Sequence, residues 1–450
     1  MHTGTMAMSD TDRFMLLAEK TLKEARALGA QWCDVSVGSG RHIGVSLEKT
    51  AVKCADSGRS ESASVRVFVS GAMGYATCGG LGEDRLLAAA RRAVGLAREG
   101  SPDPDFQGLP SPGEAADVLR LYDPAIAAMS VEDVVALAVA NIRLARELEP
   151  AVNLSGNVSL SAGDSVLVSS TGVRLARQRT EFDADMEATV LRGDDKGYFY
   201  DFDSGRMLDD CRIADLARAA IEGARRMLGA RRMPSGRMPI VLGPLAAEDF
   251  YGDLIDSANA ESIQRGRSYL CGKEGVKVAG EVVTLADDGL LDGGLYSGPF
   301  DGEGALRRRV TIFERGVFAA MLHNSYTAAK AGRENTGHGV RTGGIRHTNV
   351  VPTLGTKTAE EIIRETGDGL YLAISHFSPN STTGDLSASV DFGFRIVGGE
   401  IAYPVESTML AGNMLDLAAS IDAVSSDYRE EPGNRMPTLR IQDVQVAGTE

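Results

Sequence analysis

Residues 240–260 read Ile-Val-Leu-Gly-Pro-Leu-Ala-Ala-Glu-Asp-Phe-Tyr-Gly-Asp-Leu-Ile-Asp-Ser-Ala-Asn-Ala, and this stretch decides the fold of the C-terminal half. It opens with an apolar run that ends in a Gly243-Pro244 turn. Apolar residues at helical spacing then predict a helix from Leu245 to about Ala258. The chain continues through Arg265-Gly266-Arg267-Ser268, Cys271-Gly272 and a turn at Asp287-Asp288-Gly289.

A series of short motifs follows this stretch in a defined order. They are Ser297–Gly304, an Arg-rich strand candidate at Leu306–Phe313, Arg315–Phe318, Leu322–Lys330, Thr336–Gly339, Tyr403-Pro404-Val405 and Ala411-Gly412-Asn413. Each motif is weak by itself. Their order and spacing together carry the family assignment.

This succession resembles the TldD/PmbA family, also called the modulator-of-DNA-gyrase family, over residues 14–448. It is most similar to the TldE/PmbA branch, whose members lack the family's zinc motif and pair with a TldD-type partner. The resemblance implies a metallopeptidase-like fold in which subunits pair around an internal cavity.

The zinc ligands of the catalytic branch have no counterpart in this chain. In TldD-type chains the helix after the Leu-Gly-Pro turn carries His-Glu-x-x-x-His, which falls here on residues 252–257. Gly252 and Ser257 stand at the histidine positions, and Asp253 stands at the glutamate position. Neither glycine nor serine supplies the imidazole nitrogen that such a site requires. The family's cysteine ligand precedes a final strand, here Met436–Ile441, but residues 422–435 contain no cysteine. The resemblance therefore implies a degenerate metal motif, with no catalytic residue and no metal ligand in this chain.

The charge balance argues against a nucleic-acid partner. The chain has 450 residues, 24% of them charged, and a net charge of −15. Neutralising phosphates requires clustered Lys and Arg. The one basic run, Arg307-Arg308-Arg309, lies in a strand candidate, where a solvated strand face is the simpler interpretation.

Cysteine usage and hydropathy predict a cytoplasmic protein. The five cysteines are scattered, odd in number and without CxxC spacing, which fits reduced thiols. Residues 1–10 lack a positively charged start followed by an apolar core, so we expect no signal peptide. No uncharged apolar run approaches the roughly 20 residues that span a bilayer, and we expect no membrane association.

Local patterns predict an N-terminal α+β domain over residues 13–232, preceded by a flexible N-terminus at residues 1–12. Helices are expected at about Thr11–Leu28, Leu81–Arg98, Ser130–Glu147 and Asp209–Ala230, the third opened by a capping box at residues 130–133. Strand candidates are Trp32–Val37, Ile43–Glu48, Ala63–Ser70, Tyr75–Cys78, Val152–Leu160, Ser165–Ser169, Val173–Arg179, Phe182–Leu191 and Gly197–Phe202. Within them, Asp183, Asp185 and Glu187 form an acidic stripe, for which one face of a half-solvated strand is the simpler interpretation.

The C-terminal part, residues 237–450, is predicted to be mainly antiparallel β. Polar and turn-forming residues at 231–236 mark the boundary that precedes it. Helical periodicity returns at Thr358–Glu365 and briefly at Asn413–Ile421. The fold class is therefore α+β, with an α+β domain followed by a metallopeptidase-like β-rich domain.

Candidate contact residues cluster in and before a Gly-rich loop. His323, Thr336, Gly337, His338 and Gly339 are the candidates for cavity or substrate contacts, with the loop expected to be mobile, polar and close to a cavity mouth. Its glycines fit a close backbone approach to another chain or ligand. A metal site built from His338, His347 and a carboxylate is the less favoured alternative, since scattered histidines often imitate sites.

The leading functional hypothesis is a non-catalytic subunit of a TldD/TldE-type zinc metallopeptidase that cleaves unfolded peptides inside a shared cavity. Zinc would then reside in the TldD-type partner, and this chain would be inactive without that partner. A second hypothesis is a component of an amide hydrolase that tailors a small-molecule or peptide natural product. A third is a metal-free homodimer that binds peptides without cleaving them.

Overall fold

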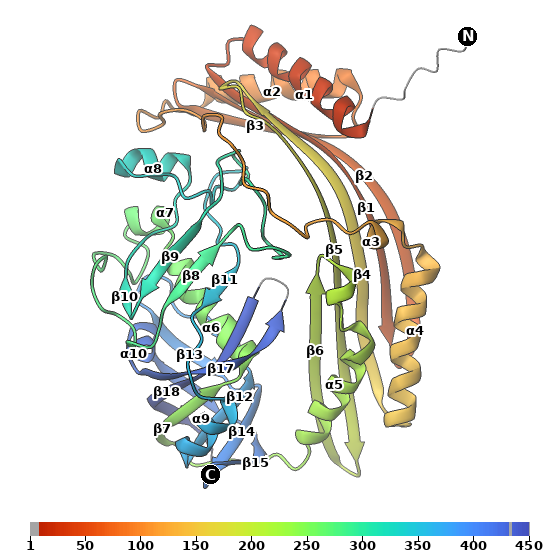
Figure 1. Ribbon diagram of the computed structural model, residues 1–450, viewed down its shortest axis with the longest axis vertical. Helices are drawn as coiled ribbons and strands as arrows, with labels where there is room; N and C mark the ends of the chain where they lie inside the picture. The colour runs from red at the N-terminus through yellow and green to blue at the C-terminus, as the bar shows by residue number, and fades with distance from the viewer. Residues whose placement is uncertain (1–8, 432–433, 450) are drawn as a thin grey trace.

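Six long strands of the N-terminal half form one antiparallel sheet in the order β3-β2-β1-β4-β5-β6 (Figure 1). The computed structural model describes residues 9–431 and 434–449. The strands are β1 (Trp32–Glu48), β2 (Ala51–Val69), β3 (Ala72–Gly79), β4 (Asn153–Ser169), β5 (Arg174–Arg192) and β6 (Asp195–Gly205). The helices are α1 (Asp10–Ala27), α2 (Glu83–Glu99), α3 (Pro124–Ala128), α4 (Val131–Leu148) and α5 (Ile213–Arg226), with a 3₁₀ turn at Leu208–Asp210. The strands curve, and the C-terminal half lies on their concave side (Figure 1).

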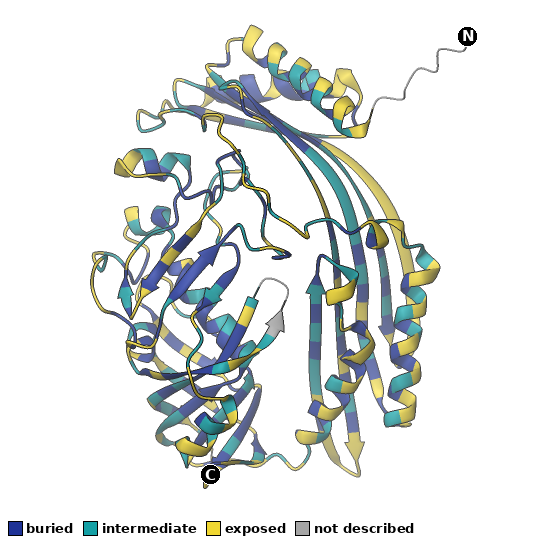
Figure 2. Cartoon of the chain, viewed as in Figure 1, coloured by how far each residue is buried: buried dark blue, intermediate teal, exposed yellow. Residues whose placement is uncertain are grey.

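The helices cover one face of this sheet because the apolar residues alternate along its strands. On β1, Val35 and Val37 belong to the core that includes α1 and α2, whereas Ile43, Val45 and Leu47 belong to the core that includes α4 and α5. The residues between them point to the opposite face, and Figure 2 shows the alternation of buried and more exposed positions along the strands. The inner, helix-free face is thus left to polar and small side chains.

Several strands are longer than the sequence patterns predict. The two candidates at 32–37 and 43–48 are halves of the single strand β1, and the same is true of the candidate pairs in β4 and β5. The intervening residues 38–42, Gly-Ser-Gly-Arg-His, carry no apolar alternation. They are strand because β2 and β4 pair with them on both sides, which satisfies their backbone groups whatever their side chains are.

Helix boundaries follow the sequence more closely. The expected capping box opens α4, because Ser130 accepts the backbone N–H of Asp133 and the Asp133 carboxylate accepts the backbone N–H of Ser130. Residues 10–12, expected in the flexible N-terminus, form the first turn of α1, and residues 1–8 of that expectation lie outside the described residues. Helix α5 is shorter than expected, because residues 208–210 turn as a separate 3₁₀ segment.

The C-terminal half begins at β7 and forms two further sheets, with pairings that are mostly antiparallel. A four-stranded sheet has the order β10-β9-β8-β11, and an eight-stranded sheet has the order β13-β16-β18-β7-β12-β14-β15 with β17 beside β18. The strands are β7 (Gly236–Leu242), β8 (Leu285–Asp288), β9 (Arg309–Glu314), β10 (Val317–Phe318), β11 (Val350–Pro352), β12 (Gly369–Ile374), β13 (Asp385–Ser389), β14 (Phe392–Val397), β15 (Glu400–Val405), β16 (Met409–Asn413), β17 (Ile421–Glu431) and β18 (Asn434–Ala447). The helices are α6 (Pro244–Ser257), α7 (Ala260–Gln264), α8 (Ser325–Ala331), α9 (Ala359–Thr366) and α10 (Met414–Ala419). Strands β7 and β12 pair in parallel.

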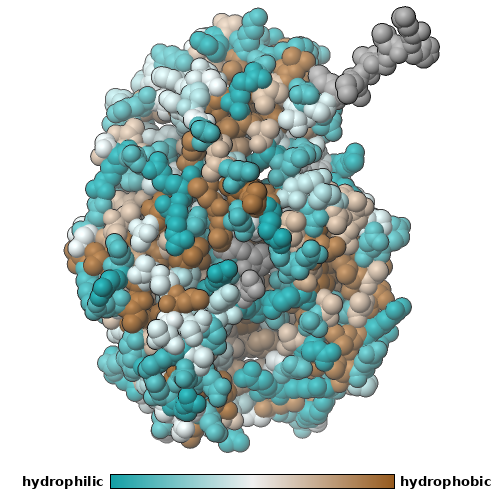
Figure 3. Space-filling model, in the orientation of Figure 1, coloured by the Kyte–Doolittle hydropathy of each residue, from teal (hydrophilic) through white to brown (hydrophobic). Residues whose placement is uncertain are grey.

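The mixed α+β class and the largely antiparallel C-terminal half are therefore as expected from the sequence. Of the boundary expected at residues 231–236, residues 231–235 lie between α5 and β7, and Gly236 is the first residue of β7. Hydrophilic and hydrophobic residues are interspersed over the face in Figure 3. Within the described ranges, no helix combines the length and hydropathy needed to cross a bilayer.

Candidate functional site

Helix α6 is the element that carries the degenerate motif, and a glycine turn sets its position. Gly243 precedes Pro244, the first helical residue, and a Cβ at Gly243 would lie 2.4 Å from the Tyr371 hydroxyl oxygen on β12. A larger residue there would require the Tyr371 ring to move. One side of α6 is buried in the C-terminal core through Phe250, Leu254 and their apolar neighbours.

The motif positions on α6 do not fit a zinc site. The space around the missing Cβ of Gly252 is open to 4 Å, so nothing replaces the absent imidazole there. Ser257 is buried, and its Oγ donates to the Leu254 carbonyl at 2.6 Å. Only Asp253 offers a ligating group, and zinc in proteins requires at least three such groups. Across residues 9–431 and 434–449, no group of three or more His, Cys, Asp or Glu side chains is arranged to hold a metal ion.

Asp253 is a carboxyl group in an unfavourable place for charge. Burial, and the nearby charges of Asp249 and Asp256, raise the pKa of Asp253 to about 7. Its Oδ2 is buried and accepts no hydrogen bond from the residues that the structure describes. A group of this kind is protonated over part of the physiological pH range.

His347 lies against the same helix as a cationic partner. Its Nδ1 lies 2.6 Å from Asp256 Oδ1, at the last turn of α6. Burial by itself lowers the pKa of His347, but the hydrogen bond and charge of Asp256 outweigh it and raise the pKa above its usual value. The raised pKa favours the imidazolium form of His347, with Asp256 as its direct partner.

The two histidines considered as a metal pair point to different partners. His338 is fully buried, and its Nε2 lies 2.7 Å from Asp287 Oδ1 while its Nδ1 lies 2.9 Å from Thr336 Oγ1. Burial raises the pKa of Asp287, but the hydrogen bonds and charge of His338 and the hydrogen bonds of Thr348 outweigh it and hold that pKa below its usual value. The alternative of a shared site for His338 and His347 is therefore contradicted by their geometry.

Residues 336–339 at the start of the Gly-rich loop are buried, whereas Gly343 and Gly344 later in the loop line a cavity. Thr336, Gly337, His338 and Gly339 are all buried, as is His323, whose backbone N–H donates to Thr336 Oγ1 at 2.7 Å. The glycines do permit a close backbone approach, but to other segments of the same chain. A Cβ at Gly337 would lie 2.5 Å from the Leu306 carbonyl oxygen, and one at Gly339 would lie 2.6 Å from Glu303 Cγ.

A cavity of about 260 Å³ lies beside α6, between the two halves of the chain. Its lining combines aromatic and acidic groups, namely Tyr200, Phe202, Glu248, Asp249, Tyr296 and His376, together with others. The Tyr200 hydroxyl lies 3.2 Å from His376 Nε2. Burial raises the pKa of Glu248 and of Asp249, so both carboxyl groups gain stabilisation from a positively charged or hydrogen-bonding ligand.

Sequence reasoning missed these lining residues, because they come from β6, α6 and loops that are distant in the chain. The stripe Asp183, Asp185 and Glu187 does form one face of a half-solvated strand, as the sequence indicated. These residues lie on the inner face of β5, opposite to the buried positions Phe182, Ala184 and Met186. The alternation itself was the available signal, but it does not tell which face meets the other domain.

Three family models match the chain. They are PmbA/TldA metallopeptidase domain 1 over residues 33–97, the central domain over residues 124–228 and the C-terminal domain over residues 235–448. A metalloprotease of Methanothermobacter thermautotrophicus is 28% identical, covering 93% of this chain and 96% of its own length. The metalloprotease PmbA of Escherichia coli O157:H7 is 24% identical, covering 96% and 95%. The crystal structure of TldE from Thermococcus kodakarensis has the same fold, with a TM-score of 0.89 at 24% identity over 96% of this chain and 100% of that chain.

Proposed function

The chain belongs to the PmbA/TldD family of metallopeptidases, and from that premise we propose that it is a non-catalytic, TldE-type subunit. Its role is to complete a peptide-binding cavity together with a TldD-type partner. The zinc ion, and the residues that activate water on it, belong to that partner. The substrate class is an unfolded peptide or a peptide-like molecule.

The observation that carries this proposal is the chemistry of α6 at the motif positions. Gly252 has no side chain, and the Ser257 hydroxyl is buried and hydrogen-bonded within its own helix. Asp253 keeps a carboxyl group, but its raised pKa makes it a weak ligand near neutral pH, since a metal ligand must be deprotonated. No step of peptide hydrolysis is therefore assigned to residues of this chain.

The fold supports a binding role instead. The inner face of the N-terminal sheet and the aromatic and acidic cavity beside α6 both face the space between the two halves of the chain. Extended peptides commonly bind by adding a strand to a sheet edge, where backbone groups and alternate side chains are both within reach, and the sheets of the C-terminal half offer such edges. This chain would hold and align a peptide, and the partner would cleave it.

The test is to purify this chain alone and co-expressed with a TldD-type chain from the same genome. Zinc is measured by elemental mass spectrometry, and cleavage of an unfolded peptide is followed by mass spectrometry. We expect less than roughly a tenth of an equivalent of zinc and no cleavage for the chain alone. The co-purified pair should contain about one zinc per partner subunit and should cleave the peptide.

A gain-of-ligand variant provides the control. Gly252→His with Ser257→His restores both histidine positions, and the open space at Gly252 accepts the ring. The variant alone should remain inactive, because the cysteine ligand is still missing. A full equivalent of zinc together with metal-dependent cleavage by the unmodified chain alone would refute the proposal. A stable homodimer that binds no TldD-type chain would also refute it.

A further inference from the structure

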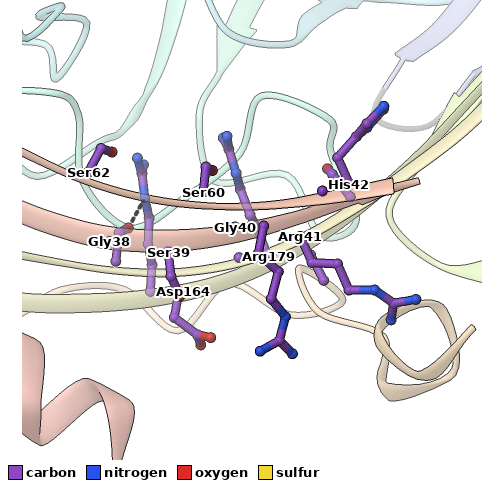
Figure 4. Close-up of a pocket in the computed structure, with 16 residues that line it drawn as sticks. Gly38, Ser39, Gly40, Arg41, His42, Ser60, Ser62, Asp164 and Arg179 are labelled. Carbon is purple, nitrogen blue, oxygen red and sulfur yellow. Dashed lines mark hydrogen bonds between the residues drawn. The ribbon is translucent and has the colours of Figure 1, made fainter. Parts of the chain in front are cut away.

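Part of the inner face of the N-terminal sheet consists of glycine and serine residues, which we call the Gly/Ser floor. Two neighbouring rows cross the strands, Ser62–Gly38–Ser165 and Ser60–Gly40–Gly163, with each residue paired to the next by the strand register. A cavity of about 480 Å³ lies over these rows. In Figure 4 the side chains of Ser60, Ser62 and His42 leave one face of the strands, and those of Arg41 and Asp164 leave the other.

Each row ends in an arginine on β5. Arg177 pairs with Ser165 and Arg179 pairs with Gly163, and both arginines line the cavity. Because they are two residues apart on one strand, they share a face and stand about 7 Å apart along it. The bare floor leaves room for a ligand to reach both guanidinium groups.

Within the described ranges, these arginines lack carboxylate partners, since neither belongs to an ion pair there. Arg177 donates from Nε to Ser165 Oγ at 3.2 Å, and its guanidinium lies 5.5 Å from the centroid of the Phe300 ring. Arg179 is exposed to the cavity. The chain carries a net charge of −15, so carboxylates are plentiful elsewhere.

Two further arginines crowd the same region. Arg206 is 3% exposed and donates to the carbonyl oxygens of Gly294, Thr180 and Leu295. Arg307 donates to the Tyr296 carbonyl. Burial lowers the pKa of Arg177 and of Arg206 to about 10, and repulsion from neighbouring guanidinium groups adds to this, although the charge of Glu181 opposes the shift at Arg206.

Two carboxyl groups oppose the charge of Arg206 and Arg177, Glu181 at the first and Asp301 at the second, and Asp301 is already engaged. Asp301 is 1% exposed and accepts the backbone N–H groups of Glu303, Ala305 and Gly339. Burial raises its pKa to about 7, which reduces the negative charge it offers. The cluster therefore holds a surplus of positive charge beside an open cavity, and a ligand anion is the partner that its chemistry lacks.

We propose that Arg177 and Arg179 bind the C-terminal carboxylate of a peptide that lies extended along the inner face of β5, where the small residues of the neighbouring Gly/Ser rows leave room for it. The same face of β5 continues with Glu181, Asp183 and Asp185. This acidic run repels a polyanion such as a nucleic acid and attracts an amino group. From Arg179 to Asp183 the strand rises about 13 Å, the length of roughly four extended residues. The strand thus presents a positive end and a negative end that fix the direction of a bound peptide.

This inference rests on the proposed function for the identity of its ligand, a peptide, but its test needs neither zinc nor a partner. The full chain is titrated calorimetrically with an unstructured peptide of about eight residues, a length that spans this face. The same peptide with a C-terminal amide is titrated in parallel, and inorganic phosphate serves as the alternative anion. Two variants are compared, Arg177→Gln with Arg179→Gln, and the control Arg174→Gln with Lys196→Gln.

The control variant removes the same charge from β5 and β6 at exposed positions, one of which pairs with Glu19. We expect the free carboxylate to bind about tenfold more tightly than the amide, the size expected for a charge-assisted hydrogen-bonded pair. The difference should vanish in the Arg177/Arg179 variant and persist in the control. It should shrink as salt rises from about 0.05 M to about 0.5 M.

Four outcomes overturn the inference: equal binding of acid and amide, no peptide binding, an equal loss in the control variant, or phosphate binding without discrimination between acid and amide. The comparison of acid with amide uses the unmodified chain, so a variant that fails to fold leaves the test intact. A failure of the proposed partnership would appear instead as a chain that discriminates the two peptides but joins no TldD-type subunit.

Discussion

Replacing Arg66 with methionine tests the ion-pair network that joins the two halves of the molecule. Arg66 lies on β2 with 1% exposure. Its guanidinium reaches Asp34 on β1 at 2.8 Å and Glu303 of the C-terminal half at 2.8 Å. Methionine keeps much of the side-chain volume but removes the charge and all the donors.

The expected loss is about 3–5 kcal/mol in the free energy of unfolding, because removing one partner leaves buried carboxylates uncompensated. Asp34 retains Arg341 as a partner, with Arg341 Nη1 2.6 Å from Asp34 Oδ1. Because this cation remains, the loss should lie toward the lower end of the range of about 3–5 kcal/mol. Glu303 retains the backbone N–H of Ser325 at 2.9 Å, a neutral donor that does not replace the lost cation. The total free energy of unfolding of a typical domain is only about 5–15 kcal/mol, so a loss of this size is easily measured.

Unfolding in urea is the appropriate assay, since guanidinium is itself a salt that screens ion pairs. The fluorescence of Trp32, the single tryptophan, reports on β1, and far-ultraviolet circular dichroism reports on the whole chain. Arg13→Met is the matched control. Arg13 lies 3.6 Å from Glu61 with both side chains about half exposed, so its removal should cost no more than about 1 kcal/mol.

A double variant sharpens the test. Arg66→Met combined with Glu303→Gln should cost less than the sum of the two single changes, because neutral glutamine does not need the lost cation. Equal costs for Arg66→Met and Arg13→Met would refute the reasoning, since they would mean that water or the remaining arginine compensates the buried carboxylates. Strict additivity in the double variant would refute the coupling between the two residues.

Three further predictions concern single groups. The raised pKa of Asp253, about 7, means that the contribution of this group to stability falls as pH rises from about 4 to about 7. Asp253→Asn should therefore melt at a higher temperature than wild type at pH 8 and at the same temperature near pH 4. The pKa of Asp287 is shifted in the opposite direction, so the contribution of Asp287 to stability is present at neutral pH and is lost as pH falls through its folded-state pKa. Asp287→Asn should lower the free energy of unfolding in urea by about 3 kcal/mol at pH 7. A loss below about 1 kcal/mol would contradict the pairing of Asp287 with His338. Cys33 is buried, which raises the pKa of its thiol to about 12, whereas Cys54 is exposed to solvent. Ellman's reagent should therefore label Cys54 in the native protein and Cys33 only after unfolding, and peptide mapping would identify the labelled residue.

Some features of this protein were decided by residue identity at single positions. Gly252 and Ser257 cannot supply imidazole nitrogens in any fold, so the absence of the family's motif was readable directly. The start of α4 was also readable, because a capping box involves groups only three residues apart. Local interactions of this kind depend on the sequence around them and little else.

Strand lengths and the inner surface depended on pairing between distant segments. Residues 38–42 carry no strand pattern, yet they are the middle of β1 because β2 and β4 flank them. The same pairing brings Arg177 and Arg179 to the ends of the Gly/Ser rows. The sequence shows the alternation of side chains along each strand, but neither the neighbouring strand nor its register.

Buried partners were beyond sequence reasoning for the same reason. His347 meets Asp256 from 91 residues away, and His338 meets Asp287 from 51 residues away. The sequence therefore determined which chemical groups the chain lacks and where its helices begin. The tertiary structure decided which charged groups meet, which are buried and which face a cavity, because side chains distant in sequence converge only when the sheets and the two halves of the chain pack together.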